Sequence, residues 1–181
     1  MTKAVMMVAH PDDCVIFGWP IIKRYKKLDW TILYMTYDRG TPRGDEIAKF
    51  WQAENVSVDF CGIEDNEADL TQEQIVSFDK DKVKQIIQSK VKKFDLIVTH
   101  GHDGEYGHPH HVFCHNTIDE LDMPKVFFCN GNTANLHITD VQEKQDLSKL
   151  PLHREVIEQF VYRYDGFYHC DKRAAEILRQ Q

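Results

Sequence analysis

Apolar runs of four to eight residues alternate along this chain with longer segments whose apolar residues recur at helical spacing. The runs at 4–8, 30–37, 58–63, 94–99 and 125–129 are rich in apolar, β-branched or aromatic residues and end at polar or glycine-containing turns, so we predict five strands. The segments at 14–27, 43–56, 79–93 and 109–121 carry apolar residues every three or four positions, which predicts a helix after each of the first four strands.

This alternation predicts an α/β protein with a mostly parallel sheet and helices on both faces. We expect residues 1–181 to form a single domain, a Rossmann-like three-layer sandwich. No GxGxxG motif follows the first expected strand, so a dinucleotide site is not expected. After residue 130 the pattern weakens, and we predict only a short strand at 136–139 and helices at 153–162 and 171–179.

Composition narrows the class of protein. With 181 residues, 42% hydrophobic and 28% charged, the chain resembles ordinary soluble domains, and no apolar stretch approaches the ~20 residues of a membrane span. The net charge of −7 argues against a nucleic-acid or anionic-membrane partner, because both need a concentrated basic patch. Five cysteines without a CxxC pair indicate reduced thiols. Since the first strand begins directly after Met1-Thr2-Lys3, we expect a cytoplasmic protein without a signal peptide.

A first group of polar side chains follows the strand at 4–8. His10, Asp12 and Asp13 lie where ligands bind in open α/β sheets, outside the carboxyl ends of the strands. His10 and Asp13 are three positions apart and share one face of a helical turn, so they are candidates to hold Zn²⁺ or Fe²⁺, while Asp12 is free to act on what the metal binds. The alternative is a helix start, in which the same residues cap backbone N–H groups and Asp13 complements the dipole.

A second group follows the strand at 94–99. Five of the ten histidines fall between His100 and His111, and Pro109 predicts the first residue of the following helix. If the first and fourth strands are neighbours, this turn lies against the first group. One of His108 and His111 then completes a His, Asp, His metal shell, and the other faces the substrate. The alternative is a patch of surface histidines.

Together, Ala9-His10-Pro11-Asp12-Asp13 and Gly104-Glu105-Tyr106-Gly107-His108-Pro109-His110-His111 resemble the two motifs of the PIG-L (LmbE-like) deacetylases. These are metal-dependent enzymes that remove an acyl group from an amino sugar, and the likeness covers about residues 4–130. It implies that His10, Asp13 and His111 bind the metal and that Asp12 is the general base. The same likeness implies that His108 stabilises the oxyanion or protonates the leaving amine, and that Tyr106 lies at a position associated with the oxyanion and the substrate. It also implies that Arg43 and Glu46 lie near the sugar. We add Asp38, which follows the second strand, to the expected substrate-binding residues.

The chain departs from the family pattern in three places. The family usually has Asp at the position of His110, so either that position is tolerant or the metal ligand shifts by one residue. The turn after the second strand carries Asp38-Arg39-Gly40 in place of the usual Thr-x-Gly-Glu context. The part at 131–181 is shorter than the family's usual ending, and it is there that substrate-specific loops often lie.

Two other functions fit the same residues. A metal phosphoesterase would use a second metal about 3.5–4 Å from the first, with ligands from Asp38, His100, His102 or Asp103. A binding module would hold a metal or a sugar without turnover. Because a binding site needs neither a base nor an acid, Asp12 and His108 favour a hydrolase whose substrate is a small N-acyl amino sugar or glycoconjugate. The sequence carries no signal for an oligomeric state.

Overall fold

A seven-stranded mixed sheet forms the centre of the computed structural model, which describes residues 1–65, 78–141, 143–160 and 166–181. The strand order in the described chain is β3-β2-β1-β4-β5-β7-β6. The first five strands are parallel, and β7 runs antiparallel to both β5 and β6. The strands are β1 (Lys3–Val8), β2 (Asp29–Thr36), β3 (Ser57–Ile63), β4 (Leu96–Thr99), β5 (Lys125–Phe128), β6 (Leu136–His137) and β7 (Phe167–Cys170).

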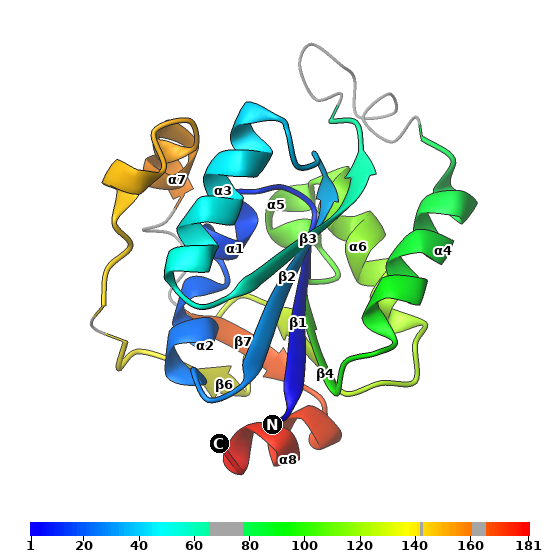
Figure 1. The fold of residues 1–181 in the computed structure, drawn as a ribbon. Coiled ribbons are helices and arrows are strands. Elements are labelled where there is room, and N and C mark those ends of the chain that lie inside the picture. Colours follow the sequence, from blue (N-terminus) through cyan, green and yellow to red (C-terminus); the bar gives the residue numbers. More distant parts are fainter. Residues whose placement is uncertain (66–77, 142, 161–165) are drawn as a thin grey trace.

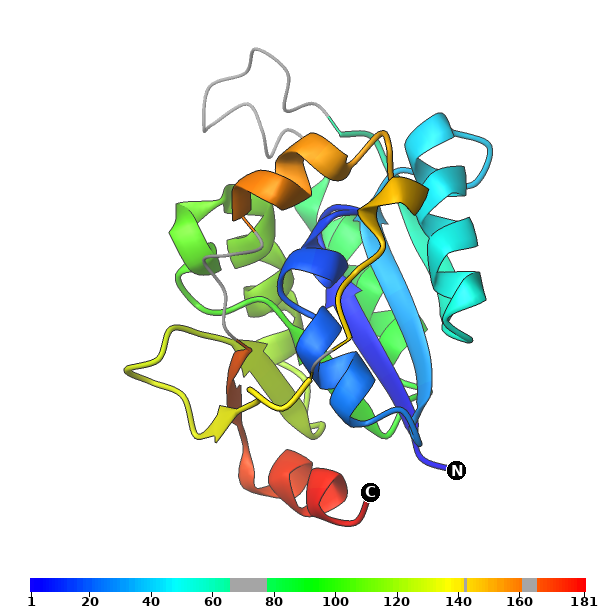
Figure 2. The ribbon, with the colours of Figure 1, turned by 90° about the vertical axis from the view of Figure 1, so that its left-hand side faces the viewer.

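Helices cover both faces of this sheet (Figure 1). They are α1 (Asp13–Ile16), α2 (Trp19–Arg24), α3 (Pro42–Ala53), α4 (Lys80–Val91), α5 (Gly104–Gly107), α6 (Pro109–Asp119), α7 (Arg154–Phe160) and α8 (Lys172–Arg179), with a 3₁₀ turn at Leu147–Lys149. Figures 1 and 2 show α1, α2, α3 and α7 on one side of the sheet and α4 and α6 on the other. The predicted α/β sandwich is confirmed.

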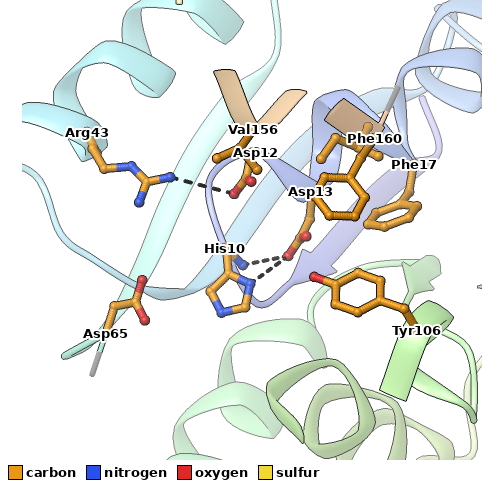
Figure 3. Close-up of a pocket in the computed structure, with 10 residues that line it drawn as sticks. His10, Asp12, Asp13, Phe17, Arg43, Asp65, Tyr106, Val156 and Phe160 are labelled. Carbon is orange, nitrogen blue, oxygen red and sulfur yellow. Dashed lines mark hydrogen bonds and ion pairs between the residues drawn. The ribbon is translucent and has the colours of Figure 1, made fainter. Parts of the chain in front are cut away.

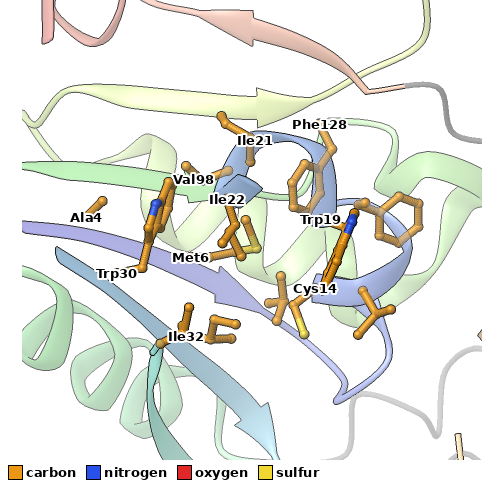
Figure 4. Packing of buried hydrophobic residues seen from close by; sticks show 14 of the residues in the cluster. Ala4, Met6, Cys14, Trp19, Ile21, Ile22, Trp30, Ile32, Val98 and Phe128 are labelled. Atoms are coloured by element: carbon orange, nitrogen blue, oxygen red, sulfur yellow. The ribbon is translucent and has the colours of Figure 1, made fainter. Parts of the chain in front are cut away.

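The side chains of β1 divide the core into two layers. Ala4, Met6 and Val8 belong to the cluster under α1, α2 and α3, whereas Val5 and Met7 belong to the cluster under α4 and α6. All five are fully buried, as expected of a central parallel strand covered on both faces. Figure 4 shows the first layer, where Met6 packs among side chains of α2 and neighbouring strands. Trp19 also belongs to this core and is 4% exposed.

The prediction of one continuous helix at 14–27 is wrong. The structure has two helices there, α1 and α2, separated at Phe17-Gly18. Pro20 has no N–H group to continue the α1 hydrogen bonds, and it lies in the first turn of α2 instead. Gly18 lies so close to β1 that a Cβ atom there would come within 2.2 Å of Met6 Sδ. The chain therefore turns where the sheet approaches it most closely.

The sequence prediction also missed β7, and it extended β6 by two residues. β7 pairs with β5 through Phe127 and His169 and separates the two C-terminal helices. Of the acidic residues expected in the loop at 64–69, those at 66–69 lie outside the described residues. Within the described chain, no helix has both the length and the apolar character required to cross a bilayer.

Candidate metal centre

The pairing of β1 with β4 brings the two polar groups together. Met7 pairs with Thr99 at the carboxyl ends of the two parallel strands, so the chain leaves both strands at the same edge of the sheet. Thr99 Oγ1 also donates a hydrogen bond of 2.7 Å to the Met7 carbonyl oxygen. The predicted adjacency of the first and fourth strands is therefore confirmed, and the segment at 10–13 faces the segment at 100–111.

Four ligand-type atoms on three residues of these segments lie close together, the two Asp13 oxygens each contacting a different imidazole. His10 Nδ1 is 3.3 Å from Asp13 Oδ2 and 3.3 Å from His111 Nε2, and His111 Nε2 is 3.3 Å from Asp13 Oδ1. Ligands that sit about 2.0–2.1 Å from a tetrahedral ion are roughly 3.3–3.4 Å apart, the edge of the tetrahedron. Two imidazoles and a carboxylate at this spacing fit Zn²⁺ or Fe²⁺.

His100 is also close to this group, but its ring nitrogens are occupied. His100 Nε2 lies 3.0 Å from the Ala9 backbone N–H and 3.4 Å from Asp13 Oδ2. The shorter contact is with a donor, so we assign the lone pair to Nε2 and the ring proton to Nδ1. His100 Nδ1 in turn lies 2.8 Å from Glu105 Oε2. His100 therefore packs behind the centre, with its ring stacked on His111 at 3.8 Å between centroids.

Glu105 contacts the opposite edge of His111. Its Oε2 atom is 2.6 Å from His111 Nδ1, and its side chain is 3% exposed. Burial alone would raise the pKa of Glu105, but His100 and His111 lower it to about 2. Burial alone would lower the pKa of His111, but Asp13 and Glu105 raise it to about 9. The electrostatics of the centre thus favour a positive charge between the two carboxylates.

Asp12 is directed away from this group and lines a pocket of about 230 Å³ (Figure 3). It is the N-cap residue of α1, but within the described chain it makes no side-chain cap hydrogen bond, contrary to the helix-start alternative. Burial and the neighbouring Asp13 raise its pKa, while His10 and Arg43 oppose this shift. Asp12 Oδ1 lies 3.9 Å from Arg43 Nη2.

The same pocket contains some of the other predicted residues. Tyr106 is 54% exposed, stacks on Phe160 at 5.6 Å between ring centroids, and directs its hydroxyl into the pocket (Figure 3). Arg43 Nη1 donates to the Tyr37 hydroxyl at 2.8 Å. The apolar wall consists of Ile16, Phe17, Val156 and Phe160.

His108 is the N-cap residue of α6, which begins at Pro109 as predicted, and its Nδ1 atom accepts the His110 backbone N–H at 3.2 Å. A neutral ring that accepts at Nδ1 carries its proton on Nε2. The His108 ring lies against two members of the centre, stacked on His111 at 4.6 Å and edge-on to His10 at 4.8 Å between centroids.

Two predicted substrate-binding residues lie outside the residues that line this pocket. The Glu46 carboxylate accepts hydrogen bonds from the Leu152 backbone N–H and from His153 Nδ1, which ties α3 to the segment before α7. Asp38 is on the exposed turn after β2, where its carboxylate accepts the Arg39 N–H at 2.7 Å. The expected substrate contacts of Glu46 and Asp38 stay predictions.

Sequence reasoning gave no role to Glu105 and placed Asp65 among solvated acids. Asp65 lines the pocket, and its Oδ1 atom is buried without a hydrogen-bond partner in the described structure. The only signal for Glu105 was its place beside Tyr106 in the second motif. His110 is buried, and its Nδ1 atom is 3.0 Å from His10 Nε2.

Fold and site together define an α/β protein with a His, Asp, His centre at the carboxyl ends of adjacent parallel strands. Residues 5–121 match the PIG-L family, described as GlcNAc-PI de-N-acetylase. The chain therefore belongs to the PIG-L family. It is also 24% identical over 159 residues to an uncharacterized protein of Acanthamoeba polyphaga mimivirus, covering 77% of this chain and 67% of the viral one.

Three solved structures share the fold. A conserved protein of Thermus thermophilus has a TM-score of 0.57 at 15% identity and covers 94% of this chain and 93% of its own. A deacetylase from the teicoplanin biosynthesis pathway has a TM-score of 0.55 at 14% identity, with coverages of 91% and 84%. A 4-carboxy-2-hydroxymuconate hydratase of Pseudomonas putida has a TM-score of 0.54 at 15% identity, with coverages of 90% and 84%.

Proposed function

We propose that this protein is a metal-dependent hydrolase that removes an N-acyl group, in the first place acetyl, from an amino sugar or amino-sugar conjugate. The observation that carries the proposal is a cluster in which His10 Nδ1 lies 3.3 Å from His111 Nε2 and each of these atoms lies 3.3 Å from one oxygen of Asp13. A pocket beside this cluster holds the separate carboxylate of Asp12. Membership of the PIG-L family supports the same reaction.

In this proposal His10, Asp13 and His111 hold the metal, with Zn²⁺ first and Fe²⁺ or another divalent ion as alternatives. A divalent metal supplies a water of lowered pKa and polarises the carbonyl oxygen of the amide. Three protein ligands leave a coordination position open, as catalytic sites require. The carboxylates of Asp13 and Glu105, one on each side of the His111 ring, supply negative charge that favours binding of a cation.

Asp12 is the proposed general base. It follows Pro11 directly, so it is held beside the metal ligands, yet the structure directs its carboxylate into the pocket. A carboxylate whose pKa is raised by burial is a better proton acceptor near neutral pH, and Arg43 at 3.9 Å favours its ionised form. Asp12 would take a proton from the attacking water.

His108 and Tyr106 are the proposed donors to the substrate. His108 Nδ1 accepts the His110 N–H, so a neutral ring carries its proton on Nε2, and this N–H is the proposed donor to the oxyanion or to the departing amine. The Tyr106 hydroxyl enters the pocket from the opposite side to Arg43 (Figure 3) and can donate to the same oxygen. A donor of this kind is worth about 2.7–4 kcal/mol in the transition state.

Arg43 lines the pocket and is the proposed substrate-binding side chain. Its Nε atom is buried and lacks a hydrogen-bond partner among the residues that the structure describes, so it can donate to a substrate oxygen. The pocket of about 230 Å³ is smaller than the roughly 300–1,000 Å³ that enclose a drug-sized ligand. We therefore propose that it takes the acylated end of the substrate, with the remainder outside.

A panel of N-acetylated amino sugars, assayed by detection of the free amine together with metal analysis of the same sample, tests this function. We expect one divalent ion per chain and amine release that stops when a chelator removes the ion. One ion per chain without amine release from any member of the panel, or amine release that survives removal of the ion, would contradict the proposal.

One observation favours the phosphoesterase alternative. His10, Asp65 and His110 each offer a ligand atom, and these atoms lie within 4.8 Å of one another, next to the first centre. A phosphoesterase would use such a group for a second metal. Two ions per chain and hydrolysis of phosphate esters would select this alternative, whereas one ion selects the deacetylase.

A further inference from the structure

Glu105 makes three hydrogen-bond contacts behind the candidate metal centre. Its Oε1 atom accepts the Gly101 backbone N–H at 2.7 Å, and its Oε2 atom lies 2.8 Å from His100 Nδ1 and 2.6 Å from His111 Nδ1. The side chain is almost fully buried. A single carboxylate therefore connects the end of β4 to an imidazole of α6.

The position of the His100 proton follows from the backbone. Because the Ala9 N–H donates to His100 Nε2, His100 has its proton on Nδ1 and donates it to Glu105. His100 also sits under His111, with the two rings 18° from parallel. His100 and the Gly101 N–H thus fix the Glu105 carboxylate in one orientation.

The fixed carboxylate then determines the state of His111. An ionised carboxylate only accepts hydrogen bonds, so His111 must donate to it from Nδ1. When His111 is neutral, as a metal ligand must be, the lone pair of the ring is then on Nε2, the atom that lies 3.3 Å from both His10 Nδ1 and Asp13 Oδ1. A partner on the outer nitrogen is how metal-binding imidazoles are held in proteins.

We propose that Glu105 is a positioning residue, whose carboxylate fixes the tautomer and the orientation of His111 so that Nε2 is presented as a metal ligand. This inference rests on the proposed function, since it presumes that the centre binds a metal. Glu105 does not touch the open side of the centre, and it is absent from the residues that line the pocket.

The backbone conformation at position 105 is one that glutamate does not favour. Its φ of 61° lies in the left-handed region, which is costly for a residue with a Cβ atom and free for glycine. Glycine already occupies the nearby positions Gly104 and Gly107, both with positive φ. A glycine would suit position 105 better by conformation alone, so the contacts of the carboxylate account for the glutamate.

The test compares Glu105→Gln with Asp103→Asn. An amide offers one acceptor and one donor edge, but position 105 must accept on both edges, from Gly101 and from the two imidazoles. Asp103 is the matched control, because it belongs to the same turn, is exposed, and accepts the Glu105 backbone N–H at 3.2 Å. Zinc affinity is measured by competition with a chromophoric chelator, and thermal unfolding of the metal-free proteins is measured in parallel.

We expect Glu105→Gln to weaken zinc binding by about 10–100-fold and Asp103→Asn to leave it unchanged. A role in stability alone would lower the melting temperature of the metal-free protein without changing the zinc affinity. A second measurement uses the wild-type chain only. Long-range ¹H–¹⁵N NMR of the zinc-loaded protein should show His111 protonated on Nδ1, with its ring signals assigned through their couplings to the sequentially assigned backbone.

The outcomes separate the two proposals. A wild-type chain that fails to bind zinc or any other divalent ion stoichiometrically overturns the proposed function itself. A wild-type chain that binds zinc, combined with equal affinity in Glu105→Gln, overturns only the role of Glu105. If Glu105→Gln does not fold, the tautomer decides, and a His111 protonated on Nε2 in the zinc-loaded wild-type protein overturns the role.

Discussion

His110 Nδ1 lies 3.0 Å from His10 Nε2, on the edge of the His10 ring opposite to the one that faces Asp13 and His111. The histidine that stands where the family usually has Asp therefore contacts the proposed ligand His10 on the ring edge away from Asp13 and His111. His111 keeps its place in the centre. This arrangement favours a tolerant position 110 over a ligand that shifts by one residue.

Neighbouring histidines should therefore behave differently on substitution. We expect His111→Gln and His10→Gln to lose the metal, and His110→Gln to keep one ion per chain with about 10–100-fold weaker affinity, because it removes only a partner of His10. Metal analysis after dialysis measures the occupancy, with the exposed His102→Gln as control. Full occupancy in both His10→Gln and His111→Gln would reject this ligand set.

Asp12→Asn should separate metal binding from turnover. The amide keeps the shape of the side chain but cannot accept the proton of water, so we expect a full complement of metal and a turnover lowered about 10²-fold or more. Asp122→Asn, at an exposed position after the end of α6, serves as the control. Unchanged hydrolysis by metal-loaded Asp12→Asn would remove Asp12 from the role of base.

Two substitutions of Tyr106 separate the contribution of its hydroxyl group from the contribution of its ring. Tyr106→Phe keeps the stack on Phe160 and removes only the donor, so we expect kcat to fall by up to about 10²-fold with little change in KM. Tyr106→Ala also removes the ring that forms one side of the pocket, so it should raise KM as well. Steady-state kinetics of the two variants decide, and equal kcat in wild type and Tyr106→Phe would contradict the donor role.

Gly44→Ala should destabilise the protein although Gly44 lies in the first turn of α3. In an open helix this change gains up to about 1 kcal/mol, but a Cβ atom here would lie 2.2 Å from the Asp38 carbonyl oxygen and 2.7 Å from Thr41 Oγ1. We expect a loss of about 1–3 kcal/mol in the free energy of unfolding, measured by urea titration. A gain in stability would show that the turn before α3 relaxes freely.

His153 should make the stability depend on pH. Burial lowers its pKa, although the hydrogen bond to Glu46 opposes the shift. Below about pH 6.5 the unfolded chain therefore binds a proton that the folded His153 does not, and the free energy of unfolding falls as the pH is lowered further. Urea titrations between about pH 7.5 and pH 5.5 should show a smaller fall in His153→Gln than in the wild type. An equal fall in the two proteins would contradict this origin.

Local patterns were sufficient for much of the fold and for part of the centre. β1 and β4 were predicted because covered parallel strands are nearly continuous apolar runs. His10 and Asp13 were expected on one helical turn, but α1 begins at Asp13, and a turn in which the Asp13 N–H donates to the His10 carbonyl oxygen brings the two residues together. β7 was missed because Phe167–Cys170 is short and is specified by its distant pairing with β5. Pro20 and Gly18 were the local signals that divided the helix after β1, and the apolar periodicity concealed them.

The remaining contacts depend on geometry that spacing does not encode. Glu105 reaches His111 only because its own backbone takes a positive φ, and nothing in the adjacent residues requires this. Arg43 and Glu46 share a helical face, but of the two only Arg43 is among the residues that line the pocket. Glu46 is instead hydrogen-bonded to His153, 107 positions away. Pairings over such distances are decided by the packing of whole elements.

The placement of β1 beside β4 also bears on how the protein is made. His111 follows His10 by 101 residues, so at about 5–20 residues per second roughly 5–20 s of synthesis separate them. A nascent chain that has emerged only as far as α4 carries two of the three proposed ligands and cannot close the site. Zinc capture should therefore mark the moment at which the growing polypeptide has assembled its central strands.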